Sequence, residues 1–363
     1  LGDEEAKQVE QEMGLLDDPK LSSYLETIGQ RLAKQSPRQD VAYTFRIVDT
    51  VEPNAFALPG GHVYVSRGLL ALANSEDELA GTVGHEIGHV AARHSVKTMT
   101  RQAPFAFITN LTAGVTGLVS PTLGRAIGGI GDAATGLVVS PFNRQQERQA
   151  DRVGQDIAAR AGWDPAGLST FLNRLEREDE LRQKGPKKTS FFDTHPATPE
   201  RVKDTAAYAE ELPRAAGQPT NESRPSFLAR LDGLVVGPRA ANGILTGQVY
   251  LHPDLNFRVR FPEQWHIENS RRQVAAASQD GQEAILLGMA GSGEDPLDGT
   301  RALEKAAKAP VMQHTERLMV GGLKAARTRL KTDSSQGTLL LDLVWIAHAG
   351  KIYQLAGICH VKR

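Results

Sequence analysis

The chain has 363 residues, of which 40% are hydrophobic and 23% are charged, and its formal net charge is −1. This length exceeds what one hydrophobic core usually serves, so about two domains are expected. The ordinary composition excludes a mainly disordered chain, and the single cysteine excludes a disulfide scaffold. The balanced charge, without any block of Lys and Arg, excludes nucleic acid as the main partner, because phosphate binding needs a clustered basic surface.

The first part of the chain alternates between helical and extended patterns. Apolar residues at helical spacing predict helical structure from Ala6 to Gln35. Two extended runs follow, at 41–48 and 61–66, and turn-forming residues lie between them. Ser75 and Glu78 have the spacing of a capping box, which predicts a long helix from there to about Thr100.

A second long helix is expected from Arg144 to Ala161, because Gly162 follows it as a stop signal. Asp164 and Pro165 then have the pattern of an N-cap and a first-turn proline for the next helix. Between the two long helices, residues 102–124 carry no charge. Their Pro, Thr, Ser, Asn and Gly content favours a buried or flap-like helical pair over a segment that touches the membrane.

The composition changes after Leu212, which predicts a linker at 213–245 and a separate module at 246–363. The module contains alternating, strand-like stretches and one helical stretch, at 299–308, so it is expected to be an α+β domain. The strand-like stretches are 257–261, 284–289, 326–331, 338–347 and 352–358.

The motif that carries chemistry is His85-Glu86-Ile87-Gly88-His89, an H-E-x-x-H sequence on the first long helix. Positions four apart lie on one helical face, so both imidazoles can converge on one tetrahedral Zn²⁺. Glu86 lies beside them without being forced to bind the metal. It can take a proton from the attacking water and later deliver it to the leaving amine.

A catalytic zinc site wants a third protein ligand and an open fourth position. Glu147 and Asp151 lie four apart on the second long helix and share a face. Beside an H-E-x-x-H motif, this spacing indicates that Glu147 binds the metal and that Asp151 accepts the outer N–H of a ligand histidine. Without that motif, such a pair is usually a solvated helix face.

Several further motifs occur together and resemble the gluzincin family of CAAX prenyl proteases, which includes HtpX-like and BepA-like bacterial envelope proteases. They are the run 54–65, the helix 78–94, an R-x-x-E-x-x-A-D signature at 144–151 and an H-P-x-x-x-x-R element at 195–201. The resemblance spans about 2–210. It implies a mainly helical zincin-type protease domain at 1–212 with a small sheet and a substrate-binding edge strand.

The resemblance also implies the roles of individual residues. His85, His89 and Glu147 would bind one Zn²⁺ per chain, with Glu86 as general base and acid. His195 and Arg201 would face the cleft and stabilise the oxyanion, although in BepA-like relatives the matching histidine can instead be a fourth zinc ligand that keeps the enzyme latent.

The resemblance makes residues 61–66 the edge strand that receives an extended peptide by β-augmentation. The expected substrate-binding residues are Asn54, Gly61, His62, Val63 and Tyr64. Asn54 is otherwise a turn residue, and His62 otherwise faces solvent. His94 lies about 140° from the ligand face of the helix, so it is expected to be a hydrogen-bonded helix residue rather than a ligand.

The C-terminal module resembles, more faintly, small domains of the PsbP and Mog type, through the strand and Pro-x-x-Trp corner at 252–265. It contains no metal or nucleophile constellation, so a binding role, including envelope assembly partners, is expected. Trp265 would be a core anchor.

Together these features predict a zinc endopeptidase that cleaves unfolded or misassembled cell-envelope proteins. The alternative is an envelope chaperone or assembly factor with a latent or structural zinc site. The expected partners are polypeptides, and peripheral membrane contact through 102–124 is the less favoured alternative for that segment. A periplasmic location is expected, with a signal peptide absent from this chain, which begins at Leu1.

Overall fold

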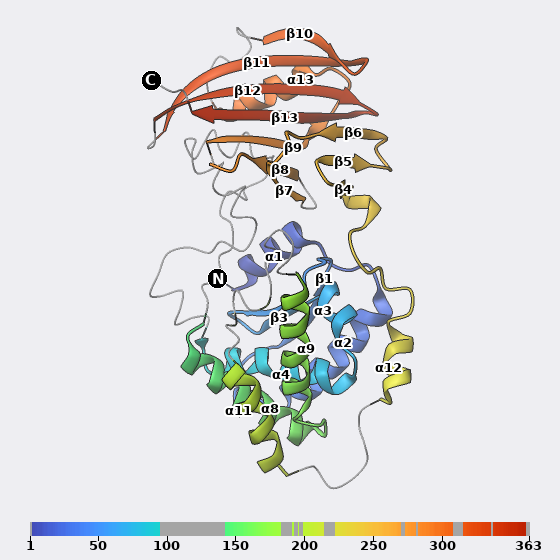
Figure 1. The fold of residues 1–363 in the computed structure, drawn as a ribbon, viewed down its shortest axis with the longest axis vertical. Coiled ribbons are helices and arrows are strands. Elements are labelled where there is room, and N and C mark those ends of the chain that lie inside the picture. The colour runs from blue at the N-terminus through green and yellow to red at the C-terminus, as the bar shows by residue number, and fades with distance from the viewer. Residues whose placement is uncertain are drawn as a thin grey trace. The chain divides into compact units, whose positions relative to one another are not determined.

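The structure is a computed structural model that describes residues 2–94, 142–182, 191, 195, 199–213, 222–269, 273–280, 282–307, 315–334 and 337–360. The predicted helical pair at 102–124 lies outside the described residues. The chain forms two compact units, and the boundary between them in the second half of the sequence falls between Gly237 and Pro238. Helices and sheets occur in both units, which confirms the mixed α+β class (Figure 1).

The N-terminal helical stretch is two helices rather than one, α1 (Gly2–Met13) and α2 (Pro19–Ala33). Gly14 has a φ of 69°, a left-handed conformation that ends α1. Asp18 then caps α2 by accepting hydrogen bonds from the backbone N–H groups of Lys20 and Leu21, and Pro19 occupies the first turn.

The small sheet of the first unit has the strand order β1 (Thr44–Val48), β3 (His62–Ser66), β2 (Ala55–Leu58). The pairing of β1 with β3 is parallel, and that of β2 with β3 is antiparallel. The prediction that residues 61–66 form an edge strand is therefore wrong. Both hydrogen-bonding sides of β3 are occupied by neighbouring strands, and all five of its residues are buried, so β3 cannot add a peptide strand.

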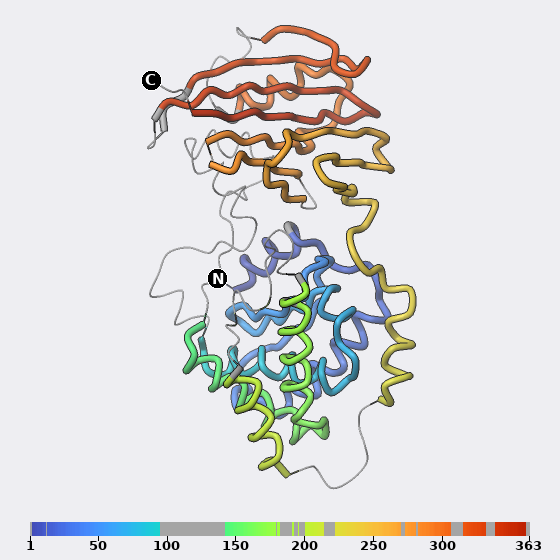
Figure 2. The backbone as a smooth tube through the Cα atoms, in the orientation of Figure 1, coloured from blue at the N-terminus to red at the C-terminus, as the bar shows by residue number. Residues whose placement is uncertain are grey.

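In the part of the first unit that the structure describes, six further helices follow. Their order along the chain can be followed in Figure 2, where blue and green segments lie together in this unit. They are α3 (Arg67–Leu72), α4 (Glu76–Ala91), α8 (Arg144–Ala161), α9 (Gly167–Arg182), α11 (Pro199–Glu211) and α12 (Arg224–Arg230).

Two helix boundaries follow the predicted signals. Ser75 caps α4 by accepting a hydrogen bond from the backbone N–H of Glu78. Asn143 and Gln146 form a capping box at the start of α8, and Gly162, with a φ of 94°, ends that helix as predicted.

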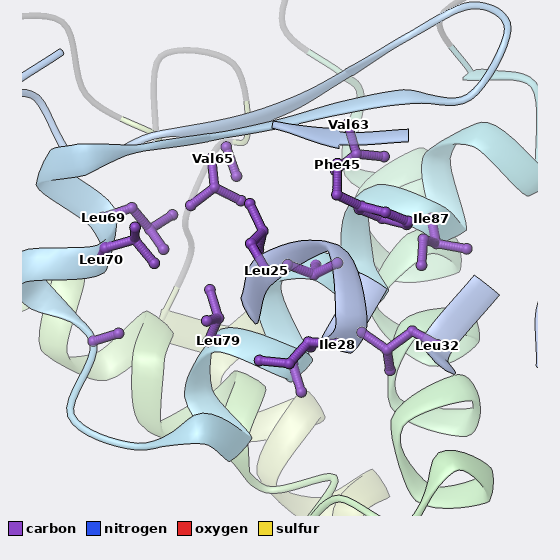
Figure 3. Packing of buried hydrophobic residues seen from close by; sticks show 14 of the residues in the cluster. Leu25, Ile28, Leu32, Phe45, Val63, Val65, Leu69, Leu70, Leu79 and Ile87 are labelled. Carbon is purple, nitrogen blue, oxygen red and sulfur yellow. The ribbon is translucent and has the colours of Figure 1, made fainter. Parts of the chain in front are cut away.

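The core of the first unit lies where α2, the sheet, α3 and α4 meet. Figure 3 shows Leu25, Ile28 and Leu32 of α2 among side chains of the strands and of α4. Leu32, Val63, Leu79 and Ile87 are fully buried in this cluster. The H-E-x-x-H helix is therefore held by apolar packing along most of its length, and this fixes the direction of its polar residues.

The stretch predicted as a linker is partly folded. Phe227 of α12 is fully buried in the core of the first unit, and Leu231 and Leu234 pack against that core. Arg67, itself buried, donates a hydrogen bond to the carbonyl oxygen of Val235. The first unit consequently extends to Gly237, beyond the predicted domain end at residue 212.

In the described residues of the second unit, a short 3₁₀ helix, η1, precedes two antiparallel sheets. The smaller sheet is β4-β5-β6, and the larger has the order β10-β11-β12-β13-β9-β8-β7. The elements are η1 (Ala240–Asn242), β4 (Ile244–Thr246), β5 (Val249–His252), β6 (Phe257–Arg260), β7 (His266–Asn269), β8 (Gln273–Ala277), β9 (Glu283–Ser292), α13 (Leu297–Ala307), β10 (Thr315–Val320), β11 (Leu323–Ser334), β12 (Gly337–His348) and β13 (Lys351–His360).

Two apolar clusters hold this unit together. The first is centred on fully buried Trp345 of β12 and includes Leu303 of α13. The second contains Tyr250 and Leu287, and Trp265 packs against it, which confirms the predicted role of Trp265 in a core. Among the residues that the structure describes, no helix has the length and apolar character needed to cross a membrane.

Candidate metal centre

The structure brings four predicted residues into one buried cluster, His85, His89, Glu147 and His195. His85 and His89 come from α4 and Glu147 from α8. His195 follows Phe191 by one turn, and its backbone N–H donates to the Phe191 carbonyl oxygen. One ligand atom from each of the four side chains can be chosen such that all lie within 4.8 Å of one another.

Four of the separations between these atoms are short enough for neighbouring ligands of one metal ion. His85 Nε2 lies 3.0 Å from His89 Nε2 and 3.2 Å from His195 Nδ1. Glu147 Oε1 lies 3.1 Å from His195 Nδ1 and 3.3 Å from His89 Nε2. Tetrahedral bonds of about 2.0–2.1 Å place neighbouring ligand atoms about 3.3 Å apart. The four measured separations therefore fit a small divalent ion such as Zn²⁺.

The chemistry of the donor atoms points to the same conclusion. His85 Nδ1 lies 2.8 Å from Asp151 Oδ1, so this nitrogen carries the proton and the Nε2 lone pair faces the centre. Burial lowers the pKa of His89 well below its usual range, which keeps its imidazole neutral. Neutral His85 and His89 imidazoles that converge with a buried carboxylate could hold a metal ion, because a cation between them would offset the repulsion of their lone pairs.

Glycines allow the two ligand-bearing helices to approach closely. On α4, Gly84 faces Gly154 of α8 and Gly88 faces Ala150 of α8. A Cβ built on Gly88 would lie 2.7 Å from the Ala150 carbonyl oxygen, and one on Gly154 would lie 2.6 Å from the His85 nitrogen. The backbones therefore touch directly at the level of the site, which brings Glu147 and Asp151 opposite the two histidines.

Glu86 is fully buried beside the cluster, and neither of its carboxylate oxygens has a hydrogen-bond partner among the described residues. Its Oε1 lies 3.5 Å from His195 Nε2. Burial raises the pKa of Glu86 above its usual range, although the nearby His195 and His85 act in the opposite direction. A carboxylate whose oxygens have no hydrogen-bond partner is suited to accept and return a proton.

Arg201 contacts the carboxylates of both Asp151 and Glu147. Its Nε and Nη2 each lie 2.7 Å from an oxygen of Asp151, and its Nη1 lies 2.7 Å from Glu147 Oε2. Burial acts to raise the pKa of Asp151, but the charge and hydrogen bonds of Arg201 outweigh it and hold that pKa below its usual range. In this geometry the guanidinium orients carboxylates, whereas the sequence prediction assigned it to the oxyanion.

The Nδ1 atom of His195 lies near the ligand atoms of His85 and Glu147. Burial acts to lower the pKa of His195, but the charges of Glu147 and Glu86 outweigh it and raise that pKa. The ring stacks on Phe191, with centroids 4.3 Å apart. Of the two predicted positions, fourth ligand and oxyanion stabiliser, the 3.1–3.2 Å separations from Glu147 and His85 favour the ligand position.

The predicted substrate residues do not gather at this cluster. His62 is held between the Thr44 hydroxyl and the Asp3 carboxylate, at 3.0 and 2.8 Å from its two ring nitrogens. The Tyr64 hydroxyl donates to Glu10. Val63 is part of the core, and Asn54 is buried with its Oδ1 unpartnered among the described residues. Gly61 has a φ of 93° and precedes β3.

Three side chains at the site were not predicted. Phe142 stacks on His89, with centroids 4.0 Å apart, and Phe191 stacks on His195. Gln149 Oε1 lies 3.2 Å from His94 Nε2, and His94 is buried against His89. The sequence signal for Phe142 is its place directly before Asn143, the N-cap of the helix that carries Glu147.

Comparison with known proteins agrees with this geometry. Residues 19–209 match the model of peptidase family M48. The chain belongs to this family. The matched residues include the whole of α4 and α8, and thus the helices that carry His85, Glu86, His89 and Glu147.

Three similar proteins show how far the similarity extends. The beta-barrel assembly-enhancing protease of Escherichia coli K12 is 30% identical over 217 residues, which cover 58% of this chain and 44% of that protein. Metalloprotease LoiP of the same strain is 33% identical over 178 residues, covering 49% and 66%. The mitochondrial metalloendopeptidase OMA1 of Schizosaccharomyces pombe is 29% identical over 188 residues, covering 52% and 53%. The similarity thus spans less than half of the assembly-enhancing protease.

Proposed function

We propose that the chain is a zinc-dependent endopeptidase that hydrolyses peptide bonds of unfolded or misassembled cell-envelope proteins. The observation that carries the proposal is the convergence of His85, His89 and Glu147 in one buried cluster. Beside them lies Glu86, whose carboxylate oxygens have no hydrogen-bond partner among the described residues. Membership of peptidase family M48 supports the activity. The name of the E. coli assembly-enhancing protease supports the substrate class.

In the proposed mechanism His85, His89 and Glu147 hold one Zn²⁺. When bound, Zn²⁺ supplies a Lewis acid for the scissile carbonyl. Glu86 accepts a proton from the attacking water and delivers it to the leaving amine, so its unpaired oxygens and raised pKa serve both transfers. Asp151 keeps the His85 proton on Nδ1, and Arg201 holds Asp151 and Glu147 in place.

We propose that His195 is the fourth ligand and that the described state is a closed one; the separations of His195 Nδ1 from Glu147 Oε1 (3.1 Å) and from His85 Nε2 (3.2 Å) support this. His195 is fully buried and stacked on Phe191, and it must leave before a substrate carbonyl can approach. This occupancy also favours the second candidate function, an envelope chaperone or assembly factor with a latent zinc site. The two functions differ in whether Glu86 ever works as a base.

We further propose that the chain consists of a protease domain and an accessory domain. Residues 1–212 with α12 form the protease domain, part of 213–245 connects it, and 246–363 form an accessory domain, for which the PsbP/Mog-like assignment stays a prediction. Among the described residues, the only His/Cys/Asp/Glu group that could hold a metal lies outside 246–363, and we propose that this domain binds assembly partners. The name of the E. coli relative, a beta-barrel assembly-enhancing protease, supports the proposal of a periplasmic location.

The test compares zinc content and casein degradation for the wild type, Glu86→Gln and His195→Ala. Glu86→Gln keeps the shape of the side chain and is not a ligand, so it should bind zinc and lose proteolysis. Equal cleavage by wild type and Glu86→Gln would refute the endopeptidase. Zinc binding with no cleavage by any variant, and suppression of substrate aggregation by all three, would support the chaperone instead. A gain of activity in His195→Ala would support the closed state.

A further inference from the structure

His94 is a buried histidine that the proposed mechanism does not use. Its Nδ1 lies 3.0 Å from Nδ1 of His89, and its ring meets the His89 ring edge-on, with centroids 5.0 Å apart. The contact is on the outer side of the His89 ring, because His89 Nε2 faces His85 and Glu147. On its own outer side, His94 Nε2 lies 3.2 Å from Gln149 Oε1.

The direction of these hydrogen bonds decides whether His89 can bind a metal. When His94 Nε2–H donates to the Gln149 carbonyl oxygen, the neutral His94 ring has a lone pair on Nδ1. That lone pair accepts the proton of His89 Nδ1–H and leaves His89 Nε2 unprotonated towards the centre. The opposite direction would put a proton on His89 Nε2, 3.0 Å from His85 Nε2, and would exclude the ion.

The backbone is shaped to bring His94 to this place. Helix α4 ends at Ala91, and Arg93 has a φ of 56°, which is the left-handed region that residues other than glycine rarely adopt. The Arg93 side chain is exposed, whereas His94 beyond it is 1% exposed. The turn thus changes the direction of the chain at the end of α4 and places the His94 imidazole against the outer edge of His89.

We propose that His94, supported by Gln149, is the positioning residue for the ligand His89. It fixes the Nδ1–H tautomer and the ring orientation of His89, while Phe142 stacks on the ring face. The two ligand histidines are therefore held differently, His85 by the carboxylate of Asp151 and His89 by a neutral imidazole. This inference rests on the proposed metal site.

The experiment separates the hydrogen bond from packing by comparing two replacements of His94. Asn carries a carbonyl oxygen at the position of Nδ1, so His94→Asn keeps the acceptor for His89, whereas His94→Phe keeps the ring and removes the acceptor. Zinc affinity is measured by chelator competition on the full chain, and the visible spectrum of the Co²⁺-substituted protein reports the geometry. His94→Phe should weaken zinc binding about tenfold or more and change the spectrum. His94→Asn should restore most of both.

A second pair of variants acts from outside the core. Gln149 is exposed, so its replacements are not expected to disturb folding. Gln149→Glu keeps an acceptor for His94 Nε2–H and should bind zinc like the wild type. Gln149→Leu removes it and should weaken binding, though less than His94→Phe, because water can reach this position.

Three results would overturn the proposal. They are zinc affinity unchanged in His94→Phe, equal losses in His94→Phe and His94→Asn, and equal affinities in Gln149→Glu and Gln149→Leu. If His94→Phe does not fold, the Gln149 pair decides alone. Because every readout is metal binding, a wild type that binds zinc but cleaves nothing would contradict the proposed endopeptidase and leave this test intact.

Discussion

Replacing Gly154 with alanine would place a methyl group where α8 touches the backbone of α4. The added Cβ would lie 2.6 Å from the His85 nitrogen and 2.8 Å from the His85 Cα, whereas ordinary contacts begin at 3.4 Å. The helices must separate by roughly the difference, about 0.8 Å, because neither atom belongs to a flexible side chain. Metal–ligand distances tolerate only about 0.2 Å. We therefore expect Gly154→Ala to weaken zinc binding about tenfold or more.

The stability change should be smaller than this loss of function. Overpacking costs about 1–3 kcal/mol, and the higher helix propensity of alanine offsets up to about 1 kcal/mol of that. The assay is zinc affinity by chelator competition together with urea unfolding in EDTA. The matched control is Gly81→Ala on α4, the helix that carries His85, where the Cβ would lie 2.7 Å from the Leu168 nitrogen of α9.

Helix α9 carries none of the cluster residues, so Gly81→Ala should lose comparable stability and keep its zinc affinity. Unchanged zinc affinity in Gly154→Ala, or equal losses of affinity in both variants, would refute the idea that the glycine contact sets the ligand geometry. Glu147 would then reach the metal by side-chain adjustment, independently of the helix spacing.

Two further predictions concern stability. Phe227→Ala should lower the free energy of unfolding of the first unit by about 3–5 kcal/mol, because it empties a fully buried position. Leu228→Ala, at a side chain that is 37% exposed, should change this free energy little. Equal unfolding midpoints for the two variants would contradict the assignment of α12 to this core. In the second unit, the hydrogen bonds of Arg327 lower the pKa of Asp342 below its value in the unfolded chain. The Arg327–Asp342 pair therefore stabilises the folded state fully at pH values above the unfolded pKa. This stabilisation is lost as the pH falls through the folded pKa. Acid titration of unfolding should therefore be flatter for Asp342→Asn, and identical slopes for variant and wild type would count against the pair.

Most of the metal centre could be predicted because its information is local. His85, Glu86 and His89 lie on one helix, and the period of the α-helix alone places the two imidazoles together. Glu147 and Asp151 follow the same rule on α8. These positions need only the correct secondary structure and one helix–helix contact.

The remaining features depend on long-range packing, which spacing does not encode. Strand order is one example, because an alternating run such as 62–66 has the same pattern at an edge or in the centre of a sheet. The short strand β2 was missed between turn-forming residues. The place of Arg201 against Asp151 and the return of His94 past Arg93 likewise depend on contacts that form only in the folded chain.

The three-segment origin of the cluster has a consequence for tolerance to change. His85 and His195 are 110 positions apart, and Glu147 and His195 are 48 positions apart. A bound ion would therefore act as a cross-link that closes long loops of chain. Loop-closure entropy grows only logarithmically, by about 0.6 kcal/mol for each doubling of length. The stretches between the ligands can thus lengthen or shorten at small cost, and new regulatory segments can be inserted there while the reaction centre is retained.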